Sequence, residues 1–300
     1  MNLTYTYTNN EIPPEGASTI PYANQQTKQL ILANSQVNQL STLVRIATLD
    51  LNYGVTERIG LALSVPYKQI NAMGQIGAGA LTNTNDKGIG DVLVKLKYNM
   101  LPTLRSMLVF EMGVYFPTGD YGYEAAPGQL AESTLQVGRG SFGFQPSFYQ
   151  TYEVLPHRLN QFLSGSWRYQ LRNSDGYQFG QEYTLNAGLN LVTVPWLVFT
   201  EQFNFRQKTQ DNIQAALYQL EPAPINRAVL LDGNILDRPV PTTNSTYLAF
   251  STGVVVDVFD YGQLYAIAQL PIYRDFNGNL QQTVGYVFGM TKSFATPPLF

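Results

Sequence analysis

Apolar and polar residues alternate along several long segments of the chain. In residues 59–68, large apolar side chains occupy every second position, and small or polar residues stand between them. The same alternation recurs in residues 90–100, 107–116, 183–191 and 284–294. Because successive side chains of a β-strand point to opposite faces, each segment predicts a strand with one apolar and one polar face. No run approaches the roughly 18 consecutive apolar residues that a transmembrane helix needs.

The length of the alternating segments distinguishes two kinds of β-protein. Strands of soluble β-sandwiches are commonly about five residues long, whereas a tilted strand that crosses a bilayer needs about ten. The runs in this chain have the greater length, and they predict twelve strands. These are residues 2–8, 38–53, 59–69, 89–100, 106–117, 138–154, 159–172, 178–192, 196–209, 246–258, 263–274 and 281–294. An alternative with ten strands treats the N-terminal segment as a mobile arm.

The connections between these strands alternate between short and long. Short ones fall at residues 54–58, 101–105, 155–158, 193–196 and 259–262, and longer ones at 70–87, 118–137, 210–245 and 275–281, with a modest one at 173–177. Outer-membrane barrels have an even number of strands, short periplasmic turns and longer external loops. We therefore expect an all-β fold, an antiparallel up-and-down transmembrane β-barrel, as a single domain over residues 1–294 with a tail at 295–300.

The composition favours a barrel over a soluble globule. Only 13% of the residues are charged, about half the usual share, while aromatic residues also reach 13%. A formal net charge of −3 gives no case for binding nucleic acid. The chain has no cysteine, so thiolate metal sites and a lipid anchor on an N-terminal cysteine are excluded. The first residues do not form a signal peptide, and we expect that one has been removed.

Five stretches resemble a known family, the outer-membrane barrels described as transporters of the MetA pathway of phenol degradation. They are LNYGVTERIGLALSVPY (51–67), GIGDVLVKLKYNML (88–101), VFEMGVYFPTGDY (109–121), LYAIAQLPIYRDFNGN (264–279) and GYVFGMTKSF (285–294). The most specific part is the combination of a Gly-x-Gly-Asp motif at residues 88–91 with Pro-Thr-Gly-Asp at 117–120. The similarity runs over most of the chain and is weakest in residues 9–36 and 210–245.

The resemblance implies an outer-membrane location and the passage of small hydrophobic or aromatic compounds. Its partners would be outer-membrane lipid and a small-molecule solute. It carries over no catalytic or ligand-binding residue. Such chains usually end at the aromatic residue of the last strand, which is Phe294 here, but this chain continues to Phe300. Both phenylalanines are therefore candidates for the terminal signal that the assembly machinery reads.

Charged residues in the polar phase of the strands are expected to line the barrel lumen. Seven are basic and four acidic: Lys68, Asp91, Lys95, Lys97, Glu111, Arg168, Arg172, Glu182, Arg206, Lys208 and Asp257. Buried charges must be paired or hydrated. One interpretation is a polar passage with a mild preference for anions or polarisable rings. The other is a set of ion pairs, such as Lys95 or Lys97 with Glu111, that brace a filled barrel.

The strand number leaves the state of the lumen open. Eight strands leave an interior filled by side chains, and sixteen or more leave an aqueous channel. Twelve lies between the two, so an open, a gated and a plugged lumen are all compatible with the sequence.

Catalytic and metal chemistry find little support. The single histidine, His157, falls in a short turn, whereas a hydrolytic site needs its base beside a nucleophile. The Gly-x-Gly motifs at 88–90 and 138–140 stand at strand starts and are interpreted as bends of the barrel wall, not phosphate cradles. The loops at 232–234 and 275–279 lack a full set of calcium ligands. We expect no enzyme activity, no metal and no cofactor.

One charge and several aromatic residues are notable in the apolar phase. Glu201 shares its phase with phenylalanines and should face lipid, where a charge is costly, so it predicts a β-bulge or a partner protein at that point. Outward aromatic residues should form the interfacial belts: Trp167, Tyr169, Tyr183, Trp196 and Tyr286.

These patterns favour an outer-membrane channel or facilitator for the passive passage of small solutes. The alternative is a non-transporting barrel that acts as a structural or docking element for another envelope or surface component. A lipid-directed enzyme is a third hypothesis, and the single histidine argues against it.

Overall fold

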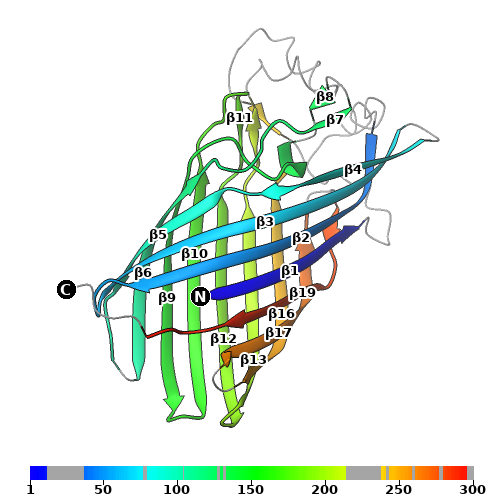
Figure 1. Cartoon of the computed structure of the whole chain (residues 1–300). Coiled ribbons are helices and arrows are strands. Elements are labelled where there is room, and N and C mark those ends of the chain that lie inside the picture. Colours follow the sequence, from blue (N-terminus) through cyan, green and yellow to red (C-terminus); the bar gives the residue numbers. More distant parts are fainter. Residues whose placement is uncertain are drawn as a thin grey trace.

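Twelve long strands of the described residues form a closed antiparallel barrel in the computed structural model of the chain (Figure 1). The structure describes residues 1–11, 37–76, 80–103, 105–126, 129–130, 133–213, 238–240, 243–258, 261–276 and 280–295. In order around the wall, the barrel strands are β1 (Asn2–Glu11), β2 (Val37–Gly54), β3 (Ile59–Ile76), β5 (Val92–Asn99), β6 (Ser106–Phe116), β9 (Gly143–Leu155), β10 (Leu159–Gln170), β12 (Glu182–Val194), β13 (Leu197–Lys208), β16 (Ser245–Asp257), β17 (Gln263–Asp275) and β19 (Gly285–Thr291).

The sheet closes because β1 pairs with strands from both ends of the chain. Along β2, the register starts with Asn2 opposite Asp50 and continues over the whole of β1. Along β19, it runs from Asn2 opposite Thr291 to Tyr7 opposite Tyr286. The strand predicted at residues 2–8 is therefore confirmed, and the ten-strand alternative is wrong.

The alternation of the sequence decides which side chains face outward. Large apolar side chains of one phase are exposed on the outside of the wall; Leu61, Leu96 and Phe110 have exposed fractions of 46%, 53% and 48%. The other phase faces inward and forms hydrogen bonds across strands, such as the 2.7 Å contact between the hydroxyls of Ser166 and Thr184. A closed wall that is apolar outside and polar inside is the arrangement of a transmembrane barrel.

Aromatic side chains lie on the outer face near both ends of the barrel. Trp167 and Tyr183 are cross-strand neighbours at the long-loop end, and the indole N–H and the phenol O–H both donate to Gln181 Oε1. Trp196 lies in the short turn between β12 and β13, at the opposite end. This distribution is the one expected of interfacial belts.

The expected loop at residues 70–87 is largely a β-hairpin. β3 continues to Ile76 and pairs with β4 (Ala80–Ile89), and the two extend the wall beyond the neighbouring strands (Figure 1). The sequence of β4, ALTNTNDKGI, has no regular apolar phase. The alternation rule therefore missed the strand, because a hairpin that stands clear of lipid needs no apolar face.

Three predicted strands begin four or five residues too early. β9 begins at Gly143 instead of residue 138, and β12 begins at Glu182 instead of residue 178. The strand expected at 281–294 is divided into β18 (Gln281–Gln282), which pairs with the end of β1, and β19, which begins at Gly285 and ends at Thr291. The period alone does not mark where the continuous pairing of a strand begins.

Small elements lie among the long connections. β11 (Tyr177–Gln178), β14 (Asn212–Ile213) and β15 (Arg238–Pro239) form a three-stranded sheet, β7 (Glu124–Ala126) pairs with β8 (Gln129–Leu130), and η1 (Ser133–Leu135) is a single 3-10 turn. Tyr177, Phe179 and Ile213 pack together as a buried cluster beside the small sheet. In the described ranges, no helix is long and apolar enough to cross a membrane.

Candidate functional site in the barrel lumen

The chain just before β9 lies against the inner faces of β3 and β4. Residues 133–142 are referred to below as the inner segment. Val137 at its centre is fully buried, and its N–H donates to the buried Asp86 carboxylate at 2.8 Å. The carbonyl oxygen of Val137 accepts a hydrogen bond from Lys68 Nζ, also at 2.8 Å. Two charged side chains of the wall therefore hold the inner segment by its backbone.

The Asp91 side chain and three glycines fix the residues that follow Val137. The buried Asp91 carboxylate accepts the backbone N–H groups of Gly119 at 3.2 Å and of Arg139 at 3.1 Å. The backbones of Gly119 and Gly138 touch, so a Cβ on Gly138 would collide with the Gly119 carbonyl. Gly140 has a φ of 68°, a conformation that favours glycine. The motif at 138–140 is thus a close crossing of two loops, and its interpretation as a bend of a barrel strand is wrong.

The inner segment carries Arg139, which the sequence did not single out as a site residue. Its Nη2 donates to Glu182 Oε1 of β12 at 2.6 Å, and its guanidinium carbon lies 4.7 Å from the centroid of the Phe179 ring. Its Nη1 is buried and has no hydrogen-bond partner among the described residues. The signal in the sequence was an arginine between two glycines, which became informative only once the crossing of Gly119 and Gly138 was known.

Arg168 of β10 stands beside this ion pair. It is the cross-strand neighbour of Glu182, yet in the described part of the chain it has no carboxylate within ion-pair distance. Its guanidinium carbon lies 3.8 Å from the centroid of the Tyr115 ring, and its Nη2 reaches Gln170 Oε1 at 3.3 Å. The Nε of Arg168 is buried and has no hydrogen-bond partner among the described residues. The Tyr115 hydroxyl in turn donates to Gln145 Oε1 at 2.5 Å.

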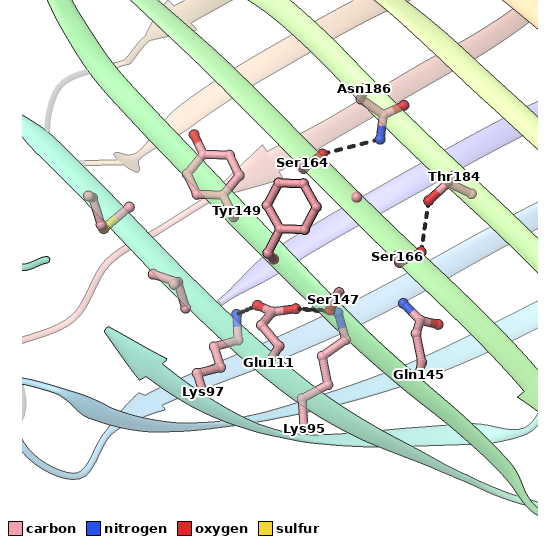
Figure 2. A pocket seen from close by; sticks show the side chains of 14 residues that line it. Lys95, Lys97, Glu111, Gln145, Ser147, Tyr149, Ser164, Ser166, Thr184 and Asn186 are labelled. Atoms are coloured by element: carbon pink, nitrogen blue, oxygen red, sulfur yellow. Dashed lines mark hydrogen bonds and ion pairs between the residues drawn. The ribbon is translucent and has the colours of Figure 1, made fainter. Parts of the chain in front are cut away.

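A cavity of about 420 Å³ lies in the inner wall (Figure 2). Its lining on β10 ends at Ser166, two residues on the short-turn side of Arg168. Serine, threonine, asparagine and glutamine side chains of β9, β10 and β12 line one part of it, together with apolar and aromatic residues such as Met107, Val109 and Phe148. Lys95 and Lys97 of β5 and Glu111 of β6 form its charged side. The lining is therefore mixed, with its charges gathered on two neighbouring strands.

The two lysines share one carboxylate. Lys95 Nζ lies 2.8 Å from Glu111 Oε2, and Lys97 Nζ lies 3.0 Å from Oε1. The Ser147 hydroxyl also donates to Oε2 at 2.8 Å. The ion pair that the sequence suggested is present, and both lysines take part in it. Because one carboxylate faces two ammonium groups, one positive charge has no counterion in this cluster; Lys97 has the larger exposed fraction, 30% against 19% for Lys95.

Other predicted lumen residues lie apart from the cavity. Arg206 donates through Nη2 to Gln282 Oε1 at 3.0 Å, and its guanidinium carbon lies 5.2 Å from the centroid of the Tyr247 ring. Lys208 forms an ion pair of 2.9 Å with the fully buried Asp211. Both cations therefore have partners of their own within the described structure.

Arg172 and Asp257 belong neither to the cavity nor to the cluster around Arg168. Arg172 follows the end of β10, and its Nη1 donates to the Gly176 carbonyl oxygen at 2.6 Å within the turn before β11. Asp257 is the last residue of β16, at the short-turn end of the barrel.

His157 and the suggested metal loops give no catalytic arrangement. The His157 side chain is 96% exposed, and its Nδ1 lies 3.7 Å from Glu153 Oε1. The described residues contain no cluster of three or more histidine, cysteine, aspartate or glutamate side chains that could hold a metal ion. Residues 232–234 and 277–279 lie outside the described residues.

Glu201 faces outward in a ladder that is not interrupted at this point. It pairs with Leu189 of β12 and Thr252 of β16 with no register shift beside it, so the expected β-bulge is wrong. The Thr252 hydroxyl donates to Glu201 Oε1 at 2.7 Å. Oε2 is buried and has no partner in the described part of the chain. A neighbouring hydroxyl thus accommodates the carboxylate without a break in strand pairing.

Comparison with solved structures identifies barrels of the same kind. An outer membrane channel from Pseudomonas putida F1 superposes with a TM-score of 0.60 at 11% sequence identity, over 96% of this chain and 93% of that one. The β domain of the Bordetella autotransporter BrkA gives a TM-score of 0.49 at 11% identity, over 98% of each chain. The KdgM porin gives 0.47 at 7% identity, over 98% of this chain and 100% of that one. At 11% identity, the similarity to the Pseudomonas putida channel establishes the fold alone.

Comparison with sequences adds one finding. Among curated protein sequences, no significant match is found. The profile of one protein family, by contrast, matches residues 21–232, which is more than half of the chain. The chain belongs to the family described as "Putative MetA-pathway of phenol degradation".

Proposed function

We propose that the protein is an outer-membrane channel that lets small solutes diffuse through its lumen. The observation that carries this proposal is the cavity of about 420 Å³ in the inner wall, whose lining combines charged, hydroxyl, amide and apolar side chains. Ligand pockets of proteins commonly have volumes of this order, about 300–1,000 Å³. A barrel that served only as a wall would have no need of such a space.

The outer face supports the location. Apolar side chains cover it between aromatic residues at both ends, as in barrels that span the outer membrane. Outer-membrane lipid is therefore the proposed partner of that face.

The solutes would be small, and the family description points to aromatic compounds. A guanidinium held against the Tyr115 ring, and Tyr149 in the cavity wall, offer surfaces for a planar ring, while the surrounding hydroxyl and amide groups favour solutes that also carry polar atoms. Passage needs only diffusion past these side chains. We propose no catalytic residue, cofactor or covalent intermediate.

Recording from single molecules in planar lipid bilayers tests the proposal. The purified full-length chain should give discrete current steps, and liposomes that contain it should swell in solutions of small solutes. A conductance of zero together with the absence of swelling, in a sample whose folding is verified by heat-dependent mobility in gel electrophoresis, would rule out a channel.

Glu201 supports a second candidate, a barrel that docks another envelope component. A carboxylate on a lipid-facing wall is unfavourable, and a basic partner docked on that face would offset its cost. Photo-crosslinking from position 203, on the same face, would capture such a partner in intact cells. Crosslinks to lipid alone would argue against this candidate.

A further inference from the structure

Cations gather at two successive levels of the lumen wall. At the cavity, Lys95 and Lys97 face the single carboxylate of Glu111. Nearer the long loops, three cations gather: Lys68, Arg139 and Arg168. In the described structure, only Arg139 among these three forms an ion pair, and its partner is Glu182.

The other two carboxylates near the three cations bind backbone groups. Asp91 accepts hydrogen bonds from the backbone N–H groups of Gly119 and Arg139, and Asp86 accepts one from the N–H of Val137. Lys68 donates to the Val137 carbonyl oxygen, which carries no charge. Among the described residues, the three cations therefore share one ion pair, and Arg168 has none.

Arg168 connects the two levels. It lies two residues beyond Ser166, a residue of the cavity wall, which places it about 7 Å further along β10. Its ring partner Tyr115 donates to Gln145, another residue of that wall. The guanidinium group is therefore held just beyond the long-loop end of the cavity lining, and the Lys95–Lys97–Glu111 cluster lies on the side formed by β5 and β6.

The hydrogen bonds of Arg168 are incomplete. Among the described residues, its Nε has no hydrogen-bond partner, its hydrogen bond to Gln170 is long at 3.3 Å, and its flat face is covered by Tyr115. Nη1 of Arg139 likewise has no partner in that part of the chain. A planar guanidinium whose face is stacked and whose edge is unused matches the geometry of a carboxylate, which it binds through two parallel hydrogen bonds.

We propose that the cavity binds small organic acids as monoanions, with the carboxylate held by Arg168 and with Lys97 supplying the second positive charge. This inference rests on the proposed channel function in so far as the bound acid is the transported solute. The one ammonium group in excess at the cavity suits a single negative charge better than a phosphate dianion. The hydroxyl and amide groups between the two levels would contact the remainder of the acid.

Binding of benzoate and of its neutral analogue benzamide to the detergent-solubilised full-length protein tests the proposal. The two probes have the same shape, so saturation-transfer NMR should report tighter binding of benzoate. Arg168→Gln should weaken benzoate binding by at least about tenfold, because a hydrogen bond to a charged group contributes more than one decade of affinity. Benzamide binding should stay unchanged. Arg168→Lys keeps the charge without the planar fork and should lie between the wild type and Arg168→Gln.

Arg206→Gln is the matched control. Arg206 is also a lumen arginine with a tyrosine ring and a glutamine beside it, but it lies apart from the cavity. The control should retain benzoate affinity within about twofold, since it removes only distant, screened charge. Equal loss in both variants would assign the effect to the general lumen potential and overturn the site. Equal binding of benzoate and benzamide to the wild type would overturn it as well.

Folding and conductance separate the remaining outcomes. If Arg168→Gln does not fold, Lys97→Met decides instead, because full benzoate affinity in that variant contradicts the two-cation site. In bilayers, millimolar benzoate should interrupt the current and benzamide should not. Benzoate binding without any conductance would contradict the channel function and leave the binding site standing. Conductance with no preference for benzoate would contradict the binding site and leave the channel function standing.

Discussion

The ammonium group of Lys68 lies 2.8 Å from the carbonyl oxygen of Val137, a residue 69 positions further along the chain. This contact joins the barrel wall to the inner segment, and the Asp86 carboxylate holds the N–H of the same residue. The inner segment is thus held against the barrel wall by charged side chains that bind backbone atoms, and these side chains can be replaced one at a time.

Lys68→Met should loosen the inner segment. The variant loses a hydrogen bond from a charged donor, worth about 1.5–3 kcal/mol, while the aliphatic part of the side chain is kept. Single-channel recordings should show a larger mean conductance and more frequent current fluctuations than the wild type. Lys87→Met is the control. Lys87 is exposed on β4, and its substitution removes the same charge without breaking the contact with Val137. An equal change in both variants would mean that net charge, and not the contact with Val137, sets the conductance.

Gly138→Ala should displace the inner segment without unfolding the barrel. The added Cβ would collide with the Gly119 carbonyl, and backbone atoms cannot move aside as a flexible side chain can. The expected result is a wider or more variable channel with unchanged heat-dependent mobility in gel electrophoresis. Gly122→Ala provides the comparison, since a Cβ at that position meets nothing within 4 Å. Identical conductance of the two variants would contradict the close crossing.

Glu111→Gln should make the channel more selective for anions. Lys95 and Lys97 lose their shared counterion, so two positive charges face the lumen without compensation. The reversal potential in a potassium chloride gradient should shift towards the chloride value. Barrel stability should fall by about 1–3 kcal/mol, because the two ammonium groups lose their charged acceptor. A shift towards potassium would show that other groups govern the potential at the cavity.

Glu201→Leu should stabilise the barrel in lipid. The substitution removes a lipid-facing carboxylate, whose cost is below the roughly 2–4 kcal/mol of a basic residue at the midplane. Thr252→Val should act in the opposite direction, because it deprives Glu201 Oε1 of its 2.7 Å donor. Urea unfolding from lipid vesicles measures both. A strong loss of stability in Glu201→Leu would indicate that the carboxylate has a structural partner.

Much of the fold could be predicted because lipid imposes a simple rule on the strands. In β5 and β6, every second residue contacts lipid, so the apolar phase of residues 92–98 and 108–116 is regular and its register follows. Glu111 and Lys97 were placed on the same face by this rule alone. The rule fails in β4, whose sequence carries no regular alternation.

The inner segment could not be predicted for a different reason. Lys68, Asp86 and Asp91 hold it by backbone N–H and carbonyl groups, and every residue type except proline offers both. No pattern of side chains in residues 133–142 predicts these contacts. The position of Arg139 follows from them, so its role beside Glu182 became visible only in three dimensions.

The pairing of β1 with β19 bears on how the barrel forms. The other neighbouring strands follow one another in the sequence and can pair early. The pairing of β1 with β19 joins Asn2 to Thr291 and can form only once the last strand is present. Until then, the first strand keeps a free edge that can recruit other chains. A chain in which folding stops before β19 pairs would therefore be an open, aggregation-prone sheet instead of a smaller pore. Closure of the barrel is then a single late step of folding.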